Sequence, residues 1–338
     1  MFIEAIEKIN SSLDLNVEEA SKCLELILEN KISESDIMAL LEALCNKGEA
    51  VDEIVGFAKT LQSKMVKVKL ESEAIDLCGT GGSGLSRFNI STFVAFILAS
   101  SGVKVAKHGN KGSRTNNGSF DLLEELGINL NTTSSQEEEL FKELGLCFLF
   151  ARTHHPAMKA VGPARAKLGR RTIFNLIGPL CNPGSVENQI VGISNQSLGP
   201  KMAEVMLKLG KKKALIVYGE PGIDEFSLSG TSTYWLVNEG KVSQGSITPE
   251  EIGISPQQYE SLPGGDCTEN AKIFMSLLNN NPCQGLQNMA AFNAGAAFWL
   301  MDQCASIKEG YLLSLELLAS GKVKACFEAY RDQQSKIS

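Results

Sequence analysis

The feature that most constrains the fold is an apolar run at residues 74–78, which ends in a glycine-rich turn and is followed by an apolar helical pattern at residues 90–100. A strand that enters a helix through such a turn is typical of α/β proteins. More short apolar runs, typical of buried strands, lie at residues 103–106, 146–150, 190–193 and 214–218, with helical patterns at residues 120–126 and 201–209. This alternation predicts an α/β domain with a mainly parallel central sheet.

The first 68 residues differ from the rest of the chain, because their apolar residues recur at helical spacing and glycine and proline are scarce. Asn16 with Glu19, and Ser33 with Asp36, have the spacing of helix N-caps with an acidic partner. We therefore expect a small all-helical N-terminal domain at residues 1–68.

The larger α/β domain is expected at residues 69–338. The stretch 163–172 is basic and helical in pattern, and it interrupts the alternation of strands and helices. We expect helices within residues 163–185 to join the N-terminal lobe.

Composition excludes several classes of protein. The formal net charge is −7, whereas a domain that binds nucleic-acid phosphates is normally basic. The nine cysteines include no C-x-x-C pair, which argues against a disulfide framework or a zinc site. The N-terminus lacks the pattern of a signal peptide, and no run approaches the roughly 20 apolar residues of a membrane helix. These features predict a cytoplasmic protein with free thiols and no nucleic-acid or membrane partner.

The glycine-rich turn at residues 79–84 is the first candidate binding element. Glycines allow close backbone approach, and the N-terminus of the following helix, entered through Asn89, Ser91 and Thr92, offers free N–H groups and a partial positive charge. The spacing G-T-G-G-x-G is neither a Walker A motif nor the dinucleotide fingerprint. The pattern fits a phosphate cradle, and it equally fits a tight turn with ordinary helix capping.

The second candidate element is the polar stretch 107–119, which follows directly on a predicted strand. It holds the cations Lys107, Lys111 and Arg114 among many hydroxyl and amide groups. Such a loop can wrap a diphosphate, although most polar loops are simply solvated. Lys107 and His108 favour the functional interpretation, since functional groups of open α/β sheets collect at strand ends.

Several separate motifs resemble the anthranilate phosphoribosyltransferase family. They are GTGG at residues 79–82, NIST at 89–92, VAKHGN at 105–110, HPAM at 155–158, Arg165 through Thr172, FNLIGPLCNP at 174–183, Asp224-Glu225, GGD at 264–266 and Asn270-Ala271. They occur in the family's order, and the resemblance extends from the N-terminal helices to residue 322. It implies a homodimer in which each active site lies between a helical and an α/β domain, and transfer of the phosphoribosyl group of phosphoribosyl pyrophosphate (PRPP) to anthranilate in tryptophan biosynthesis.

The resemblance also implies roles for individual residues. PRPP would be held by Gly79, Gly82, Ser83, Asn89, Ser91, Thr92, Lys107 and Ser119. Mg²⁺, the implied cofactor, would be held by Ser91, Asp224 and Glu225. Anthranilate would contact Gly79, His108, Asn110, His155, Arg165 and Pro179.

These residue types suit the implied chemistry. Hard oxygen ligands such as Asp224 and Glu225 suit Mg²⁺, which makes pyrophosphate a better leaving group. A guanidinium such as that of Arg165 binds a carboxylate bidentately. An aromatic amine is already a free nucleophile, so no general base is assigned. Without the resemblance, the acidic pair would fit an exposed turn, and Arg165 would fit a surface helix charge.

The chain departs from the family pattern in the pyrophosphate region. Ser83 stands where the family usually has Asp, residues 111–115 replace an Arg and a Ser-Ser pair, and Phe120 replaces a small residue. These changes leave open a shifted Mg²⁺ dependence, or a paralogue with another aromatic acceptor. The pattern also leaves open a nucleoside phosphorylase-like enzyme of the same fold and a non-catalytic nucleic-acid-binding relative. The net charge of −7 and the presence of Asp224, Glu225 and Arg165 argue against the last of these.

Overall fold

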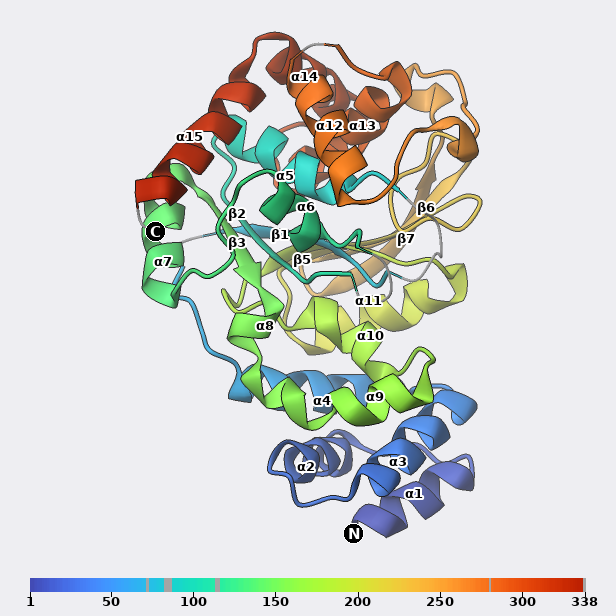
Figure 1. The fold of residues 1–338 in the computed structure, drawn as a ribbon. Helices are drawn as coiled ribbons and strands as arrows, with labels where there is room; N and C mark the ends of the chain where they lie inside the picture. Colours follow the sequence, from blue (N-terminus) through green and yellow to red (C-terminus); the bar gives the residue numbers. More distant parts are fainter. Residues whose placement is uncertain (71–72, 82–86, 113–115, 280, 337–338) are drawn as a thin grey trace.

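The computed structural model describes residues 1–70, 73–81, 87–112, 116–279 and 281–336. A small helical lobe lies beneath a larger α/β domain, as Figure 1 shows, so the predicted fold class is confirmed. The N-terminal helices of the lobe are α1 (Phe2–Asn10), α2 (Val17–Leu28), α3 (Glu34–Lys47) and α4 (Val51–Lys64).

The two predicted helix caps are present in the lobe. The side chain of Asn16 accepts a hydrogen bond from the backbone N–H of Glu19 at 2.9 Å, and the Glu19 carboxylate accepts one from the N–H of Asn16 at 2.9 Å. Ser33 Oγ accepts from the N–H of Asp36 at 3.2 Å. These bonds satisfy N–H groups that the first turn of a helix leaves unpaired, so they fix where α2 and α3 begin.

Two later helices, α9 (Gly162–Leu168) and α10 (Ile173–Ile177), lie against the lobe in Figure 1. Helix α9 contacts α3, and α10 contacts α4. The ring of Phe174 on α10 meets the ring of Phe57 on α4 edge-on, with centroids 6.0 Å apart. The chain therefore crosses from the α/β domain to the lobe and back between β3 and β4.

The central sheet has the strand order β3-β2-β1-β4-β5-β6-β7. The strands are β1 (Ile75–Gly79), β2 (Val105–Gly109), β3 (Leu146–Phe150), β4 (Asn188–Gly192), β5 (Lys213–Gly219), β6 (Ser232–Asn238) and β7 (Lys241–Ile247). The first five pair in parallel, whereas β6 and β7 add an antiparallel edge that we did not predict. Strand β2 begins two residues later than the predicted strand and extends to Gly109, which places Lys107 and His108 within the strand.

The alternation of side chains along each strand divides the interior into separate cores. On β4, Ile190 faces the core that contains α5, while Val191 faces the core shared with the lobe. On β5, Leu215 likewise faces the core that contains α5, and Ile216 faces the core shared with the lobe. Since successive side chains of a strand point to opposite faces, a continuous apolar run is the pattern of a strand covered on both sides.

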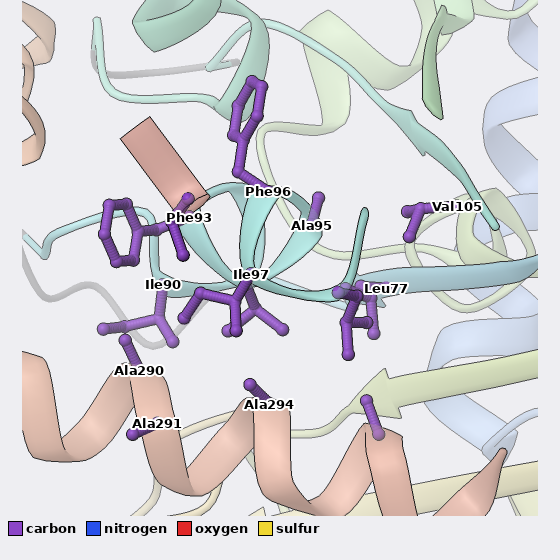
Figure 2. Packing of buried hydrophobic residues seen from close by; sticks show 14 of the residues in the cluster. Leu77, Ile90, Phe93, Ala95, Phe96, Ile97, Val105, Ala290, Ala291 and Ala294 are labelled. Carbon is purple, nitrogen blue, oxygen red and sulfur yellow. The ribbon is translucent and has the colours of Figure 1, made fainter. Parts of the chain in front are cut away.

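Helix α5 (Ile90–Ser100) is apolar around most of its circumference, and its residues from Thr92 to Leu98 are all buried. It packs on α13 (Gln284–Leu300) and α15 (Lys322–Lys336) as well as on the sheet. In Figure 2, Ala290 and Ala294 of α13 lie opposite Ile90 and Ile97 of α5. The small side chains let α13 approach closely, so the N-terminus of α5 is held at the end of β1.

The remaining elements complete the two faces of the sheet. The helices are α6 (Ser119–Glu125), α7 (Ser134–Leu144), α8 (Ala151–His154), α11 (Gly199–Lys208), α12 (Cys267–Leu278) and α14 (Ile307–Ala319). Short 3-10 helices are Pro156–Ala160, Gly178–Leu180, Gln196–Leu198, Glu250–Ile252 and Tyr259–Ser261. Among the described residues, none of the helices has the length and apolar character needed to cross a membrane. All nine cysteines are free thiols.

Candidate active site

The sheet has a switch point between β1 and β4. Strand β1 pairs with β2 on one side and with β4 on the other, so successive connections leave this point in opposite directions. The carboxyl ends of the two strands, Gly79 and Gly192, lie opposite each other. In open α/β sheets, ligands bind in the crevice at the carboxyl ends where the strand order reverses.

The acidic pair Asp224-Glu225 reaches this switch point from the segment after β5. A Cβ built on Gly79 would lie 2.4 Å from Asp224 Oδ2, and one built on Gly192 would lie 1.7 Å from the Asp224 carbonyl oxygen. Only glycine at both strand ends leaves room for this segment. Asn293 of α13 fixes the next residue, because its side-chain Oδ1 accepts from the N–H of Phe226 at 2.8 Å and its Nδ2 donates to the Phe226 carbonyl at 3.0 Å.

Ser91, Asp224, Glu225 and Asn293 all line one small cavity of about 30 Å³. That volume accommodates a water molecule or a small ion. Glu225 Oε2 is buried there without a hydrogen-bond partner. Burial raises the pKa of Glu225 to about 8, although the guanidinium of Arg87 opposes the rise. The sequence-predicted metal ligands therefore meet at one place.

The oxygen donors around this cavity fit Mg²⁺. That ion is usually held by one or two carboxylates and completes its shell with water and substrate phosphate oxygens. Within the described residues no group of three or more His, Cys, Asp or Glu side chains forms a metal cluster. The Asp224-Glu225 pair, with Glu225 Oε2 lacking a hydrogen-bond partner, suits a metal ion that binds together with a phosphate ligand. It does not suit an ion whose ligands all come from the protein.

Strand β2 carries a buried lysine to the same region. Lys107 is 2% exposed, and its ammonium group donates to the Leu77 carbonyl and, at 3.2 Å, to Ser91 Oγ. Burial lowers the pKa of Lys107, an effect that the neighbouring Asp76 opposes. The Asp76 carboxylate in turn accepts from the backbone N–H of His108 at 3.0 Å and from Gln189 Nε2 at 3.1 Å. Separate hydrogen bonds thus hold each of the two buried groups, and the bond to Ser91 places the Lys107 ammonium beside the start of α5.

An arginine clamps the glycine-rich turn. The Arg171 guanidinium donates to the carbonyls of Thr80 at 3.1 Å and Gly81 at 2.7 Å, and to Ser194 Oγ at 3.3 Å. Gly82 and Ser83, which we predicted to contact PRPP, lie outside the described residues. Arg171 belongs to one of the family motifs, but its sequence position carries no signal that it contacts a loop ninety residues away.

A network of asparagines joins two loops and helix α12 around the entry to α5. Asn270 is fully buried on α12, and its Nδ2 lies within hydrogen-bond distance of three acceptors: the Arg87 carbonyl at 2.6 Å, Asn117 Oδ1 at 2.7 Å and Asn89 Oδ1 at 3.0 Å. Asn117 Nδ2 also donates to the Arg87 carbonyl, at 2.9 Å. The network places Asn89 relative to the 107–119 loop, and Asn117 was not among the predicted site residues.

The chain's three histidines divide into a pair and a single residue. The rings of His108 and His155 lie 5.2 Å apart. His155 Nε2 contacts the Cys181 carbonyl at 2.9 Å; since a carbonyl only accepts, Nε2 carries the proton. Burial lowers the pKa of His155 to about 4 and that of His108 well below 6.5, so both rings are neutral at pH 7. His108 Nε2 and His155 Nδ1 are buried without hydrogen-bond partners.

The other predicted contacts surround this histidine pair and the loop beside it. Pro179 is buried, and its carbonyl accepts from Gln189 Nε2 at 2.5 Å. Asn110 is exposed after β2, and its side chain accepts from the N–H of Lys111 at 2.8 Å. Ser119 Oγ donates to the Asn110 carbonyl at 3.5 Å.

Two predicted residues lie on helices that border the site. Thr92 Oγ1, in the first turn of α5, is buried without a partner. Arg165 lies on α9, at the lobe side, with its guanidinium carbon 5.3 Å from the centroid of the Phe174 ring. Burial lowers the pKa of Arg165. A guanidinium that stacks on a ring keeps its N–H edge available to a planar anion.

Arg87 is the main site residue that sequence reasoning missed. Its Nη1 lies 2.7 Å from Asp224 Oδ1, and both side chains are largely buried, at 14% and 11% exposure. Its guanidinium also lies 6.0 Å from the centroid of the Tyr259 ring. Burial opposes the charge on Arg87, but Asp224 and Glu225 together raise its pKa. The sequence separation of 137 residues hides this ion pair from any local pattern.

Comparisons with known proteins agree with this architecture. Residues 3–65 match the glycosyl transferase family, helical bundle domain, and residues 71–324 match the glycosyl transferase family, a/b domain. The anthranilate phosphoribosyltransferase of Petrotoga mobilis is 40% identical over 95% of this chain and 94% of its own. That of Streptococcus mutans is 40% identical over 98% of this chain and 99% of its own.

Solved structures show the same similarity in three dimensions. Anthranilate phosphoribosyltransferase from Thermus thermophilus superposes with a TM-score of 0.91 at 37% identity, covering 98% of this chain and 99% of that one. The Saccharomyces cerevisiae enzyme in complex with PRPP and Mg has a TM-score of 0.89 at 27% identity, covering 99% and 98%. The chain therefore belongs to the anthranilate phosphoribosyltransferase family and is a pentosyltransferase.

Proposed function

We propose that this enzyme transfers the phosphoribosyl group of PRPP to anthranilate, releasing pyrophosphate, as a step of tryptophan biosynthesis. The observation that carries the proposal is the meeting of Ser91, Lys107 and the Asp224-Glu225 pair at the switch point of the sheet. Relatives that are 40% identical over nearly the whole chain are named for this activity, and a yeast relative has been solved with PRPP and Mg.

In this proposal the phosphates of PRPP lie over the glycine turn and the start of α5. The contacts come from Gly79, Gly82, Ser83, Asn89, Ser91, Thr92, Lys107 and Ser119. The Lys107 ammonium, held between Leu77 and Ser91, supplies positive charge from a fixed position. Backbone N–H groups at a helix N-terminus add partial positive charge. A preorganised cradle of this kind stabilises the charge that builds up on departing pyrophosphate.

Asp224, Glu225 and Ser91 are the proposed Mg²⁺ ligands. When bound, the ion would neutralise charge on the pyrophosphate and so assist its departure. The protein's part is to hold the two carboxylates at the strand ends, through the glycines at positions 79 and 192 and the clamp from Asn293.

The anthranilate pocket is proposed to comprise Gly79, His108, Asn110, His155, Arg165 and Pro179. The neutral imidazoles offer aromatic surface without a charge that would compete for the carboxylate. Arg165, stacked on Phe174, offers its planar N–H edge to that carboxylate. The bond from the anomeric carbon to the pyrophosphate oxygen breaks as positive charge develops on the pentose ring, the amine nitrogen forms its bond to that carbon from the opposite face, and the nitrogen then releases a proton to water. Alignment of the reactants and electrostatic stabilisation supply the rate enhancement.

We also propose that the enzyme is a cytoplasmic homodimer that joins through its N-terminal helices. Nine free thiols are typical of a reducing compartment. Ile3 and Leu13 in the lobe expose 53% and 56% of their surface, although both are apolar. Sedimentation velocity of the purified chain and of I3E/L13E would test this assignment; a dimer that persists unchanged in the double variant would contradict it.

The loss of anthranilate fluorescence in the presence of PRPP and Mg²⁺ tests the reaction. We expect R165A to raise the KM for anthranilate by about 10- to 100-fold, since a charge-assisted hydrogen-bonding partner is removed. The matched control is R170A, because Arg170 instead donates to Asn46 on the lobe surface at 3.1 Å. We expect D224N to reduce kcat/KM steeply. No PRPP-dependent loss of fluorescence across a wide range of Mg²⁺ would refute the assignment, and different aromatic acceptors should then be screened.

A further inference from the structure

The ion pair between Arg87 and Asp224 places a protein cation at the carboxylates proposed to hold the metal. Arg87 Nη1 contacts Asp224 Oδ1 at 2.7 Å, while Asp224 Oδ2 lies against Gly79 at the end of β1. Together, Arg87, Asp224 and Glu225 carry at most one net negative charge. A divalent ion that approaches these carboxylates is therefore repelled by a guanidinium in the immediate vicinity.

The surroundings of Arg87 anchor its backbone and leave space for its side chain. The Arg87 carbonyl accepts hydrogen bonds from Asn270 at 2.6 Å and Asn117 at 2.9 Å. Its side chain, by contrast, also lines a second cavity, of about 200 Å³, whose other walls include Tyr259 and Gly264. The guanidinium already lies 6.0 Å from the Tyr259 ring centroid, and an aromatic face is a favourable alternative neighbour for it.

We propose that Arg87 is an internal counter-ion that competes with the divalent metal for Asp224. In the absence of substrate, Arg87 pairs with Asp224 and keeps the affinity for the free metal ion low. When the metal binds, the Arg87 side chain leaves Asp224 and turns into the Tyr259-lined cavity, while its backbone stays fixed by the asparagines. This positioning role rests on the proposed function, because Asp224 is a metal ligand only in that assignment.

Binding of Mn²⁺ to the intact protein without PRPP, measured by electron paramagnetic resonance of the free ion, tests the competition. Arg87→Gln removes the charge and retains a polar side chain. We expect it to bind Mn²⁺ about tenfold more tightly, since even at the dielectric constant of water a guanidinium this close repels a divalent ion by that factor. Arg87→Lys keeps the charge and should bind Mn²⁺ much as the wild type does. The Mg²⁺ concentration for half-maximal turnover should fall in Arg87→Gln.

Two controls test whether a change in Mn²⁺ affinity arises at Asp224 and from the charge of Arg87. Arg331→Gln, on the exposed face of α15, removes the same charge far from the site and should leave Mn²⁺ affinity unchanged. Asp224→Asn should abolish the Mn²⁺ binding. If Asp224→Asn abolishes binding but Arg87→Gln leaves it unchanged or weaker, the competition is refuted and the proposed metal site stands. If Mn²⁺ binds equally well to Asp224→Asn, both the metal assignment and the role of Arg87 are refuted.

Discussion

Gly192 illustrates how the site depends on a single missing side chain. A Cβ at this position would lie 1.7 Å from the carbonyl oxygen of Asp224, a contact that no side-chain adjustment relieves because the clashing atom is backbone. A Cβ at Gly79 would instead meet the Asp224 carboxylate, which is the end of a side chain, so alanine there would displace the carboxylate rather than the backbone. The geometry of the proposed metal site therefore depends on the glycines at the two strand ends as well as on the acidic residues.

We expect G192A to destabilise the protein by about 3 kcal/mol or more, as overpacking against backbone does, and to remove nearly all activity by displacing Asp224. Thermal unfolding and turnover measure the two effects. The control is G240A in the β6–β7 hairpin, where the positive φ of +72° strains alanine but nothing lies within 4 Å. It should lose about 1 kcal/mol and keep its activity. Equal activity in G192A and G240A would contradict this account.

Helix α12 illustrates how an element distant in sequence supports the site. Its Asn270 is buried and bonds to Arg87, Asn89 and Asn117, which belong to two different loops. Because Asn89 lies at the entry to α5, movement of this network would change the proposed phosphate cradle. Helix α12 thus positions the loops from behind without contributing a proposed ligand.

We expect N270A to raise the KM for PRPP by about tenfold, since several buried polar atoms lose their partner, and to leave the KM for anthranilate nearly unchanged. Steady-state kinetics with each substrate varied in turn measures this. N279A, at the exposed C-cap of the same helix, is the matched control, because the Asn279 side chain accepts a hydrogen bond from Lys324 at 2.9 Å, away from the two loops. A uniform fall in kcat without a change in the KM for PRPP would argue against a positioning role.

Helices α7 and α8 are joined by a buried ion pair. His154 Nε2 lies 3.0 Å from the Glu137 carboxylate, and Nδ1 donates to the Val66 carbonyl at 2.9 Å. Burial alone would lower the pKa of His154, but the hydrogen bond and charge of Glu137 outweigh it, so the pKa is raised above 6.5. The charged form of His154 is thus favoured in the folded protein.

Because the pKa of His154 is higher in the folded than in the unfolded protein, its ion pair with Glu137 contributes fully to stability below about pH 6.5. That contribution is lost as the pH rises through the pKa of His154 in the folded protein. We therefore expect H154Q to lose about 1–2 kcal/mol more unfolding free energy at pH 6 than at pH 9. Urea unfolding at both pH values measures the difference. K208Q, which removes an exposed pair with Asp52, should show no such dependence. If H154Q loses the same unfolding free energy at pH 6 and at pH 9, His154 is not charged in the folded protein and the prediction is wrong.

At the scale of the whole molecule, the helical lobe and the underside of the sheet share one hydrophobic core. Residues of α2 and α4, such as Ala20 and Phe57, belong to the same buried cluster as Trp235 on β6 and Met202 on α11. Domains that are separate folding units rarely share a core in this way. The lobe and the sheet should consequently unfold together. The shared core also fixes the position of the lobe relative to the α/β domain, on the two sides of the candidate site.

We expect F57A in the lobe to destabilise the protein by about 3–5 kcal/mol, and to shift the transition reported by Trp235 in the sheet by as much as the transition in far-ultraviolet circular dichroism. Fluorescence in a W299F background isolates Trp235. V242A, at an exposed position on β7, should leave both transitions in place. A transition at Trp235 that F57A leaves unchanged would show that the lobe unfolds independently.

Local sequence determined the elements whose signals are short in range. The caps at Asn16 and Ser33, the first strand and helix α5 follow from patterns within about ten residues, because helix capping and side-chain periodicity depend on neighbours along the chain. The family motifs identified the fold, and with it the residues proposed for PRPP, Mg²⁺ and anthranilate.

The tertiary structure alone decided which distant groups meet. Arg87 pairs with Asp224, Arg171 clamps Thr80 and Gly81, and Asn270 joins Asn89 to Asn117, although each pair is far apart in sequence. The antiparallel pairing of β6 with β5 is also non-local, whereas β6 and β7 form a local hairpin through the two-residue turn Glu239-Gly240 that we did not predict. Such contacts are fixed by the strand order and by the packing of helices on both faces, so a sequence supplies the groups and the assembled sheet determines their partners.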